Sequence, residues 1–291
     1  MNQKTVNREI QTKSALHKLK RKIPYGWDLN LYRGCSHSCV YCYAIYTHQY
    51  LNCKDFSGEI FVKTNLVETL ERELSNKNWK REVVNIGGVT DSYQPAEKQY
   101  QLMPGVLKLL IKYKTPAIIS SKSNLILRDY DLIEQLSRIT YVNLAQTITT
   151  CDDSIRSFIE PGAASTTERF EVLKFFRKTN ASIGLHVMPI IPHLTDHRDN
   201  LEELCQRAKD CEIDYLLSGT LYLRGATRSR FFDFIEKEFP GILKELKTLY
   251  KTGGADKAYK NKLYELLNGL RDIYNISSSY MKPMREKLDQ S

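Results

Sequence analysis

The sequence contains no long apolar run, and this absence argues against a membrane-spanning helix. A helix that crosses a bilayer needs about 20 mostly apolar residues, and no such stretch occurs among the 291 residues of the chain. The first 22 residues are polar and basic, without the apolar segment of a secretory signal. We therefore expect a cytoplasmic protein that does not bind membranes.

Paired cysteines are also missing. The chain has seven cysteines, an odd number, and four of them are scattered: Cys53, Cys151, Cys205 and Cys211. A disulfide framework shows regular, even spacing, so we expect none. The sequence also has no internal repeat beyond its βα alternation, no low-complexity segment, and no helix-turn-helix or zinc-finger pattern.

The charge balance leaves two interpretations open. The formal net charge is +9, and a basic balance favours a polyanionic partner such as nucleic acid. Acidic residues are interspersed with the basic ones, which is equally typical of an ordinary solvated surface. Basic residues gather near the N-terminus, at Lys13, Lys18, Lys20, Arg21 and Lys22.

Three other cysteines carry the strongest signal. Cys35, Cys39 and Cys42 have the spacing C-x3-C-x2-C. Three thiolates so close together suit one soft metal centre. A [4Fe–4S] cluster normally takes four thiolates, so three would leave one iron open to a ligand that is not protein. The alternative is structural zinc with His37 or His48 as fourth ligand, but zinc commonly uses paired C-x2-C knuckles, and no second knuckle exists.

The rest of the chain alternates between strand-like and helix-like segments, which predicts a parallel sheet. The predicted strands are 27–32, 83–87, 117–120, 141–148, 182–191 and 215–223. The predicted helices are 97–113 (interrupted or begun by Pro104 and Gly105), 128–139, 167–178 (N-cap Ser165 or Thr166), 200–211 and 230–239. Eight βα units close a full barrel, so six predict an α/β fold with an incomplete barrel, followed by helices over 241–291, broken at Gly253 and Gly254.

Every unusual segment follows a predicted strand. Ligands in parallel α/β folds lie at the carboxyl ends of the strands. The cysteine motif follows the first strand, Gly87 and Gly88 the second, and Ser120 to Ser123 the third, while Thr147 to Thr150 end the fourth. These segments are therefore expected to share one rim and one site.

These residues resemble the radical S-adenosylmethionine (SAM) superfamily, and within it the spore photoproduct lyase-like branch, related to DNA repair photolyases. The similarity covers most of the chain from Tyr25 onward. The segments that carry it are the cysteine motif with Tyr41, Gly88 to Glu97, Ser121 to Ser123, Thr147 to Thr150, Glu160 to Ala163 with Arg169, and Pro189 to Pro192.

The resemblance implies a partial (β/α)6 barrel, the radical SAM fold, with a helical C-terminal extension. It implies three parts: a basic N-terminal extension (1–24), the barrel (25–240) and a helical segment (241–291). It also implies a [4Fe–4S] cluster, SAM and an external electron donor of the flavodoxin or ferredoxin type. The reaction expected is reductive cleavage of SAM to a 5′-deoxyadenosyl radical that abstracts hydrogen from a substrate.

The resemblance also assigns residues to the cofactors. Cys35, Cys39 and Cys42 would ligate the cluster. Tyr41 would pack on the adenine side of SAM, and Gly87 and Gly88 would let the backbone approach its amino group. Ser120 and Lys122 would meet the carboxylate or ribose, and Thr147 and Thr149 would lie near the ribose. Asp91, Tyr93 and Glu97 are catalytic candidates on the same rim without assigned roles.

Two departures from the branch matter. Spore photoproduct lyases carry a cysteine, three residues before an aspartate, that returns hydrogen to the product; counting back from Asp91, this position is Gly88. Cys151, after the fourth strand, is a candidate replacement. Met103 and Pro104 stand where the branch has a threonine–arginine pair.

Three hypotheses follow. The first is a radical SAM enzyme with an unidentified substrate. The second is a DNA-lesion lyase of the spore photoproduct type, which the charge favours and Gly88 disfavours. The third is a non-enzymatic iron–sulfur protein that binds nucleic acid, with salt-sensitive binding.

Overall fold

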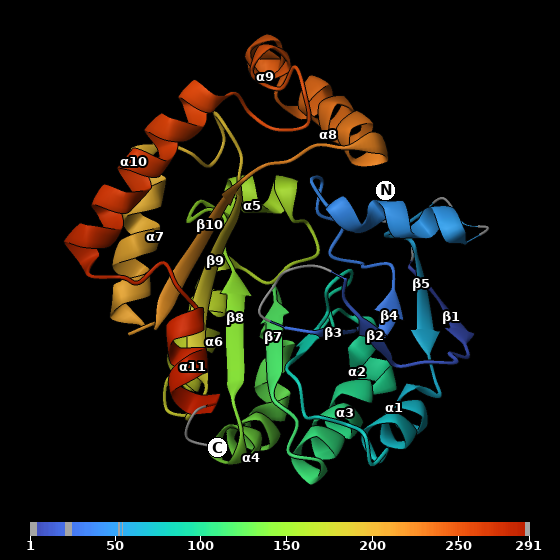
Figure 1. Cartoon of the computed structure of the whole chain (residues 1–291). Helices are drawn as coiled ribbons and strands as arrows, with labels where there is room; N and C mark the ends of the chain where they lie inside the picture. Colours follow the sequence, from blue (N-terminus) through green and yellow to red (C-terminus); the bar gives the residue numbers. More distant parts are fainter. Residues whose placement is uncertain (1–4, 21–24, 52, 54, 289–291) are drawn as a thin grey trace.

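A parallel sheet forms the centre of the molecule in the computed structural model, which describes residues 5–20, 25–51, 53 and 55–288 (Figure 1). Its strand order is β10-β9-β8-β7-β6-β3-β2. The strands are β2 (Leu16–Lys18), β3 (Trp27–Leu29), β6 (Val84–Ile86), β7 (Ala117–Ser121), β8 (Val142–Thr147), β9 (Ser182–Ile190) and β10 (Tyr215–Thr220). All neighbours pair in parallel except β2, which is antiparallel to β3.

The predicted α/β fold is confirmed. Each of the six predicted strands overlaps one parallel strand, and chain order follows sheet order from β3 to β10. The sheet order ends at β10 on one side and at β2 on the other. Over the part of the chain that the structure describes, the sheet is therefore an open, partial barrel.

The predicted first strand, 27–32, is corrected. It ends at Leu29, and β4 (Tyr32–Arg33) leaves the main sheet to pair antiparallel with β5 (Glu59–Lys63). A parallel pair joins β5 to β1 (Val6–Ile10), completing a second sheet of order β1-β5-β4. The cysteine motif consequently follows a strand of this smaller sheet.

The segment before residue 25 contributes two strands, β1 and β2, to the two sheets. Arg21 and Lys22, part of the predicted basic cluster, lie outside the described residues. The divisions predicted after residues 24 and 240 stay predictions.

The helices lie around and beyond the sheet (Figure 1). They are α1 (Leu66–Leu74), α2 (Ala96–Tyr100), α3 (Leu102–Lys112), α4 (Tyr130–Ile139), α5 (Asp153–Ile159), α6 (Thr166–Phe176), α7 (Arg198–Asp210), α8 (Gly225–Glu238), α9 (Leu243–Leu249), α10 (Lys257–Tyr274) and α11 (Met281–Leu288). Short 3-10 helices are η1 (Tyr43–Tyr50), η2 (Asn124–Asp129) and η3 (Pro240–Ile242). None of the described helices is long and apolar enough to cross a bilayer.

Two predicted helices have different bounds for visible reasons. The segment 97–113 breaks at Gln101, which has a φ of 47°, and Pro104 lies in the first turn of α3, where a missing N–H costs no hydrogen bond. Residues 128–129 belong to η2, so α4 begins at Tyr130. Ser165 is confirmed as the N-cap of α6, in a capping box with Glu168.

The two faces of the sheet differ in character. Side chains alternate between faces along each strand, and the outward-facing set, such as Ile119, Leu144 and Ile183, joins the main core with the helices. At the amino ends of the strands, Val83, Ile118 and Tyr141 pack with Met284 of α11. The C-terminal helix α11 thus packs near the amino ends of these strands (Figure 1).

Candidate active site

A glycine starts the cysteine loop (residues 34–42) at the end of β4. Gly34 has a φ of 86°, and a Cβ there would lie 2.7 Å from the carbonyl oxygen of Glu59 and 2.8 Å from that of Phe56. The amide of Cys35 donates to the Phe56 carbonyl at 3.1 Å. The segment before β5 therefore holds the first residue of the loop, and only glycine fits this turn.

The three thiols lie on one loop, where Cys39 is buried and Cys35 and Cys42 are partly exposed. Burial raises the pKa of each, that of Cys39 to about 12. The negative charges of Asp91, Cys39 and Cys42 raise the pKa of Cys35 further. Buried thiols ionise readily only beside positive charge, and the irons of a cluster supply it. The donor set fits a soft metal cluster.

The arrangement does not suit a single zinc ion. Zinc holds its ligands at about 2.0–2.3 Å, and no three His, Cys, Asp or Glu side chains within the described residues are placed to hold one ion. Nδ1 of His37 lies 2.7 Å from the Gly162 carbonyl oxygen, and Nε2 lies 3.1 Å from Asp91. His48 packs between the rings of Phe56 and Phe61. Both ring nitrogens of His37 thus have partners outside the thiol set.

Asp91 ties the cysteine loop to the ends of β6 and β7. Its carboxylate accepts hydrogen bonds from the amides of Tyr93 (2.9 Å) and Lys122 (2.8 Å) and from Ser121 Oγ (2.9 Å). Burial alone would raise its pKa, but the imidazole of His37 and these N–H donors outweigh burial and lower the pKa to about 2. Asp91 is therefore ionised, and its contacts fix the positions of His37, Ser121 and Lys122.

Gln94 provides a second connection between the cysteine loop and the segment after β6. Its Oε1 accepts from the amide of Ser36 at 3.0 Å, and its Nε2 donates to the Gly34 carbonyl at 3.2 Å. The hydroxyl of Thr90 donates to the same carbonyl at 2.6 Å. The sequence resemblance included Gln94 in a motif, and the structure shows that this side chain holds the loop backbone.

A buried network connects the loop to β8. The hydroxyl of Tyr41 donates to Glu160, whose carboxylate pairs with Arg169 at 2.6 Å. The same arginine donates to the carbonyl of Thr147 at 2.6 Å, and Thr149 Oγ1 lies 3.5 Å from Glu160. Burial would raise the pKa of Glu160, but Arg169 and then Lys122 lower it. An ionised pair thus anchors Tyr41 between Cys39 and Cys42.

Gly162 sits where the loop contacts the segment after α5. A Cβ at this position would lie 2.4 Å from the Ser36 carbonyl oxygen and 2.7 Å from the Cα of His37. The amide of Val40 also donates to the Ile159 carbonyl at 3.0 Å. The motif Glu160-Pro161-Gly162, which also suits a simple turn, here forms the surface on which the cysteine loop packs.

The remaining residues predicted to bind SAM lie around this loop. Lys122 lies 5.9 Å above the Tyr41 ring and interacts with the charges of Cys39 and Glu160. Because Ser121 binds Asp91 on one face of β7, Ser120 points to the other, inner face. Gly88 accepts a hydrogen bond from the hydroxyl of Tyr43.

Two of the catalytic candidates are used in packing. Glu97 is fully buried and accepts from Tyr32, Arg128 and the amides of Leu102 and Met103 at the start of α3. Tyr93 lies in the main core. Cys151 packs against that core and interacts with the charges of Glu203 and Arg207 on α7.

Sequence reasoning missed three polar residues on the inner face of the sheet. The hydroxyl of Tyr215 donates to Asn143 Oδ1 at 2.8 Å, and Nε2 of His186 lies 3.2 Å from that hydroxyl. His186 pairs in register with Thr147, beside Lys122, and is partly exposed. The signal was the alternation in β9, where Gly184, His186 and Met188 alternate with apolar residues.

We expect His186 to make the stability of the chain depend on pH. Burial, followed by the charge of Lys122, lowers its pKa to about 4. The unfolded chain binds this proton near pH 6.5, so stability is lost as pH falls from about 6.5 toward about 4. Urea unfolding at pH 7 and at pH 5 measures how much unfolding free energy is lost between these two pH values. This loss should be about 2 kcal/mol smaller in His186→Gln than in the unsubstituted chain. The carboxylates titrate in both proteins, so their contribution cancels in this comparison. An equal loss of unfolding free energy in the two proteins would contradict the expectation.

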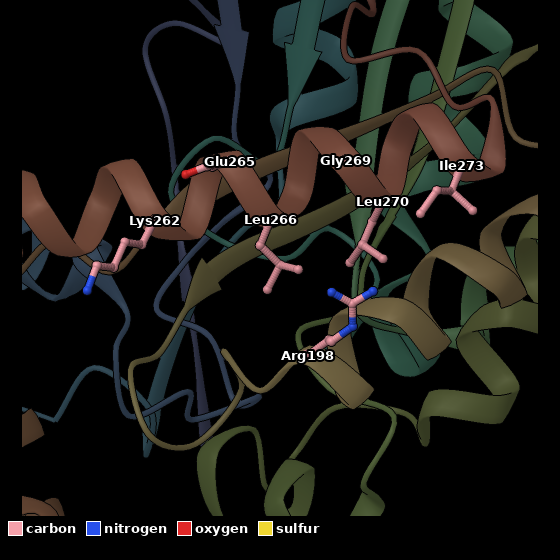
Figure 2. A pocket seen from close by; sticks show the side chains of 7 residues that line it. All are labelled: Arg198, Lys262, Glu265, Leu266, Gly269, Leu270 and Ile273. Atoms are coloured by element: carbon pink, nitrogen blue, oxygen red, sulfur yellow. The ribbon is translucent and has the colours of Figure 1, made fainter.

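A surface groove far from the loop plays no part in this arrangement. It lies between α7 and α10, with Leu266, Leu270 and Ile273 on its apolar side and Arg198 and Lys262 at its rim (Figure 2). None of the residues that line it contacts the cysteine loop, so the site is defined by the loop and the strand ends.

Comparisons with known proteins agree with this geometry. The model of the family described as "Radical SAM superfamily" matches residues 29–208. An uncharacterized protein of Mycobacterium tuberculosis is 32% identical, covering 94% of this chain and 82% of its own. One of Methanocaldococcus jannaschii is 27% identical, covering 93% and 95%. A solved spore photoproduct lyase has a TM-score of 0.68 at 12% identity, covering 92% of this chain and 79% of the lyase, which shows the fold.

Proposed function

Since this chain belongs to the radical SAM superfamily, whose cofactors are a [4Fe–4S] cluster and SAM, we propose that Cys35, Cys39 and Cys42 ligate the cluster of a radical enzyme. The observation that supports this assignment is the single short loop that carries the three thiols, held by Gln94, by Asp91 through His37, and by Glu160 through Tyr41. When bound and reduced, the cluster supplies the electron that cleaves SAM to a radical able to abstract hydrogen from a substrate.

The chain's own residues position and shield SAM. Lys122 provides a cation for its carboxylate, with the Tyr41 ring directly below that cation. The backbone at Gly87 and Gly88 would receive the amino group, and Ser120, Thr147 and Thr149 would contact the ribose. The substrate would lie against the partly exposed inner face, where Tyr215 and Asn143 hold His186. An external donor of the flavodoxin or ferredoxin type would deliver the electron.

The test is anaerobic reconstitution with iron and sulfide, followed by reduction with dithionite. We expect an EPR signal of the reduced cluster that changes when SAM is added, together with formation of 5′-deoxyadenosine. Bound zinc, or a cluster that does not respond to SAM, would contradict the proposal. The latter result would favour the iron–sulfur protein that binds nucleic acid, whose binding should weaken steeply with salt.

A lesion lyase is the second candidate, because one solved structure of this fold is a spore photoproduct lyase "with bound AdoMet and dinucleoside spore photoproduct". The formal net charge of +9 is compatible with a DNA partner. Gly88, where that branch places its hydrogen-donating cysteine, argues against it. The test is incubation of the reconstituted enzyme with a dinucleoside spore photoproduct and SAM. Release of two thymidines would favour the lyase, and an intact lesion would exclude it.

A further inference from the structure

Helix α8 contacts the cysteine loop from outside the region that the family model matches. It begins at Gly225, beyond residue 208, and lies beside the segment that follows the cysteines (Figure 1). The hydroxyl of Thr227 donates to the carbonyl of Cys42 at 2.9 Å. One Nη of Arg230 donates to both the hydroxyl (3.0 Å) and the carbonyl (3.3 Å) of Ser38. Two residues of one helix thus bind the loop backbone.

Ser38 is the strained residue of this loop. Its φ of 55° lies in the left-handed region, which is unfavourable for a residue other than glycine. Such a conformation persists only when the surroundings fix it. Ser38 directly precedes Cys39, so its backbone sets the direction in which the Cys39 thiol projects relative to Cys35. Besides Arg230, the loop's own bond from the Ser38 amide to the Cys35 carbonyl (3.3 Å) supports this turn.

We propose that α8 is a clamp that keeps the three thiols in the geometry of cluster ligands, with Arg230 as the positioning residue that holds Ser38. The inference rests on the proposed function, in which these thiols bind the cluster. Thr227 fixes the third cysteine in the same way, so the helix secures the loop on both sides of Cys39. The loop's ability to retain a cluster then depends on a segment about 190 residues away along the chain.

The charge of Arg230 adds a second effect. The guanidinium contacts Ser38, the residue directly before the ligand Cys39. Reduction adds negative charge to a cluster, so a nearby cation favours the reduced state. Loss of this cation should therefore lower the midpoint potential of the cluster. A purely structural contact would not have this effect. Arg230→Lys keeps the charge, whereas Arg230→Gln removes it.

The experiment compares Arg230→Ala, Ser38→Gly and the double variant, reconstituted alongside the unsubstituted chain. Glycine adopts a positive φ without strain, so Ser38→Gly should need no clamp. We expect Arg230→Ala to lower cluster retention about 10- to 100-fold, the loss typical of outer-sphere partners, and the double variant to recover most of it. The midpoint potential should fall in Arg230→Gln and recover in Arg230→Lys.

Arg228→Ala is the matched control, because Arg228 lies on the same helix but donates to the carbonyls of Tyr250 and Thr252. This variant should retain the cluster and have the same midpoint potential as the unsubstituted chain. In the proteins without cluster, alkylation of Cys39 by iodoacetamide should be faster in Arg230→Ala and normal in the double variant. If the unsubstituted chain forms a cluster and Arg230→Ala retains it equally at the same potential, the clamp is wrong and the proposed function stands. If the unsubstituted chain forms no cluster, the proposed function itself fails.

Discussion

Cys39→Ala should reduce formation of 5′-deoxyadenosine to background while the chain stays folded. On the proposed assignment, the substitution removes one of three thiolates from a centre that normally takes four. The cysteine side chain is small, so the packing lost is modest. The measurements are iron content and the EPR spectrum after anaerobic reconstitution, then nucleoside formed with dithionite and SAM. Far-ultraviolet circular dichroism verifies the fold.

Cys151→Ala is the matched thiol control for this prediction. Cys151 lies between the main core and α7, away from the cysteine loop. It should keep the cluster and form 5′-deoxyadenosine at an unchanged rate. Retention of a SAM-responsive cluster in Cys39→Ala would contradict the ligand assignment. A selective loss of turnover on a substrate in Cys151→Ala, with cleavage of SAM intact, would favour Cys151 as hydrogen donor.

Arg169→Met should cost about 3–5 kcal/mol of unfolding free energy, the usual cost of leaving one member of a buried ion pair without its partner. Arg169 and Glu160 are both fully buried, 2.6 Å apart. The free energy of unfolding of a whole domain is only about 5–15 kcal/mol, so this single substitution should remove a large part of the chain's stability. Urea unfolding of the chain without cofactors measures the loss.

Two further variants define the origin of that cost. Arg138→Met breaks an exposed pair with Glu134 on α4 and should cost less than about 1 kcal/mol. Adding Glu160→Gln to Arg169→Met removes the unpaired buried charge and should recover part of the loss. Equal costs for Arg169→Met and Arg138→Met would show that the buried pair does not stabilise the strand ends as described.

The six strands of the partial barrel were predictable because each is an apolar segment between turn residues, such as Ala117–Ser121. The small second sheet was not. Val6–Ile10 and Glu59–Lys63 are short and carry charged side chains, and their pairing joins segments more than 50 residues apart. The first predicted strand was too long because Tyr32 pairs with Val62 of β5, which is 30 residues further along the chain.

The site assignments stay predictions, but the structure shows how the predicted segments are arranged around the cysteine loop. The sequence motifs include Asp91, Lys122 and Glu160, and in the structure their side chains contact residues of the cysteine loop. Sequence alone did not show that Ser121, and not Ser120, binds Asp91, or that Glu97 caps α3, because these outcomes depend on which way each side chain points. Neither did it show Arg230 reaching Ser38, since a single arginine carries no spacing pattern.

The surroundings of Gly88 decide whether a larger side chain could be introduced at this position. A Cβ at this position would lie 2.9 Å from Oδ2 of Asp28, and Asn85 holds Oδ1 of that carboxylate at 2.8 Å. Gly88→Cys alone would therefore push the new thiol against a fixed anion. Room for a thiol at position 88 therefore depends on the Asp28 side chain turning away, which would break its hydrogen bond with Asn85.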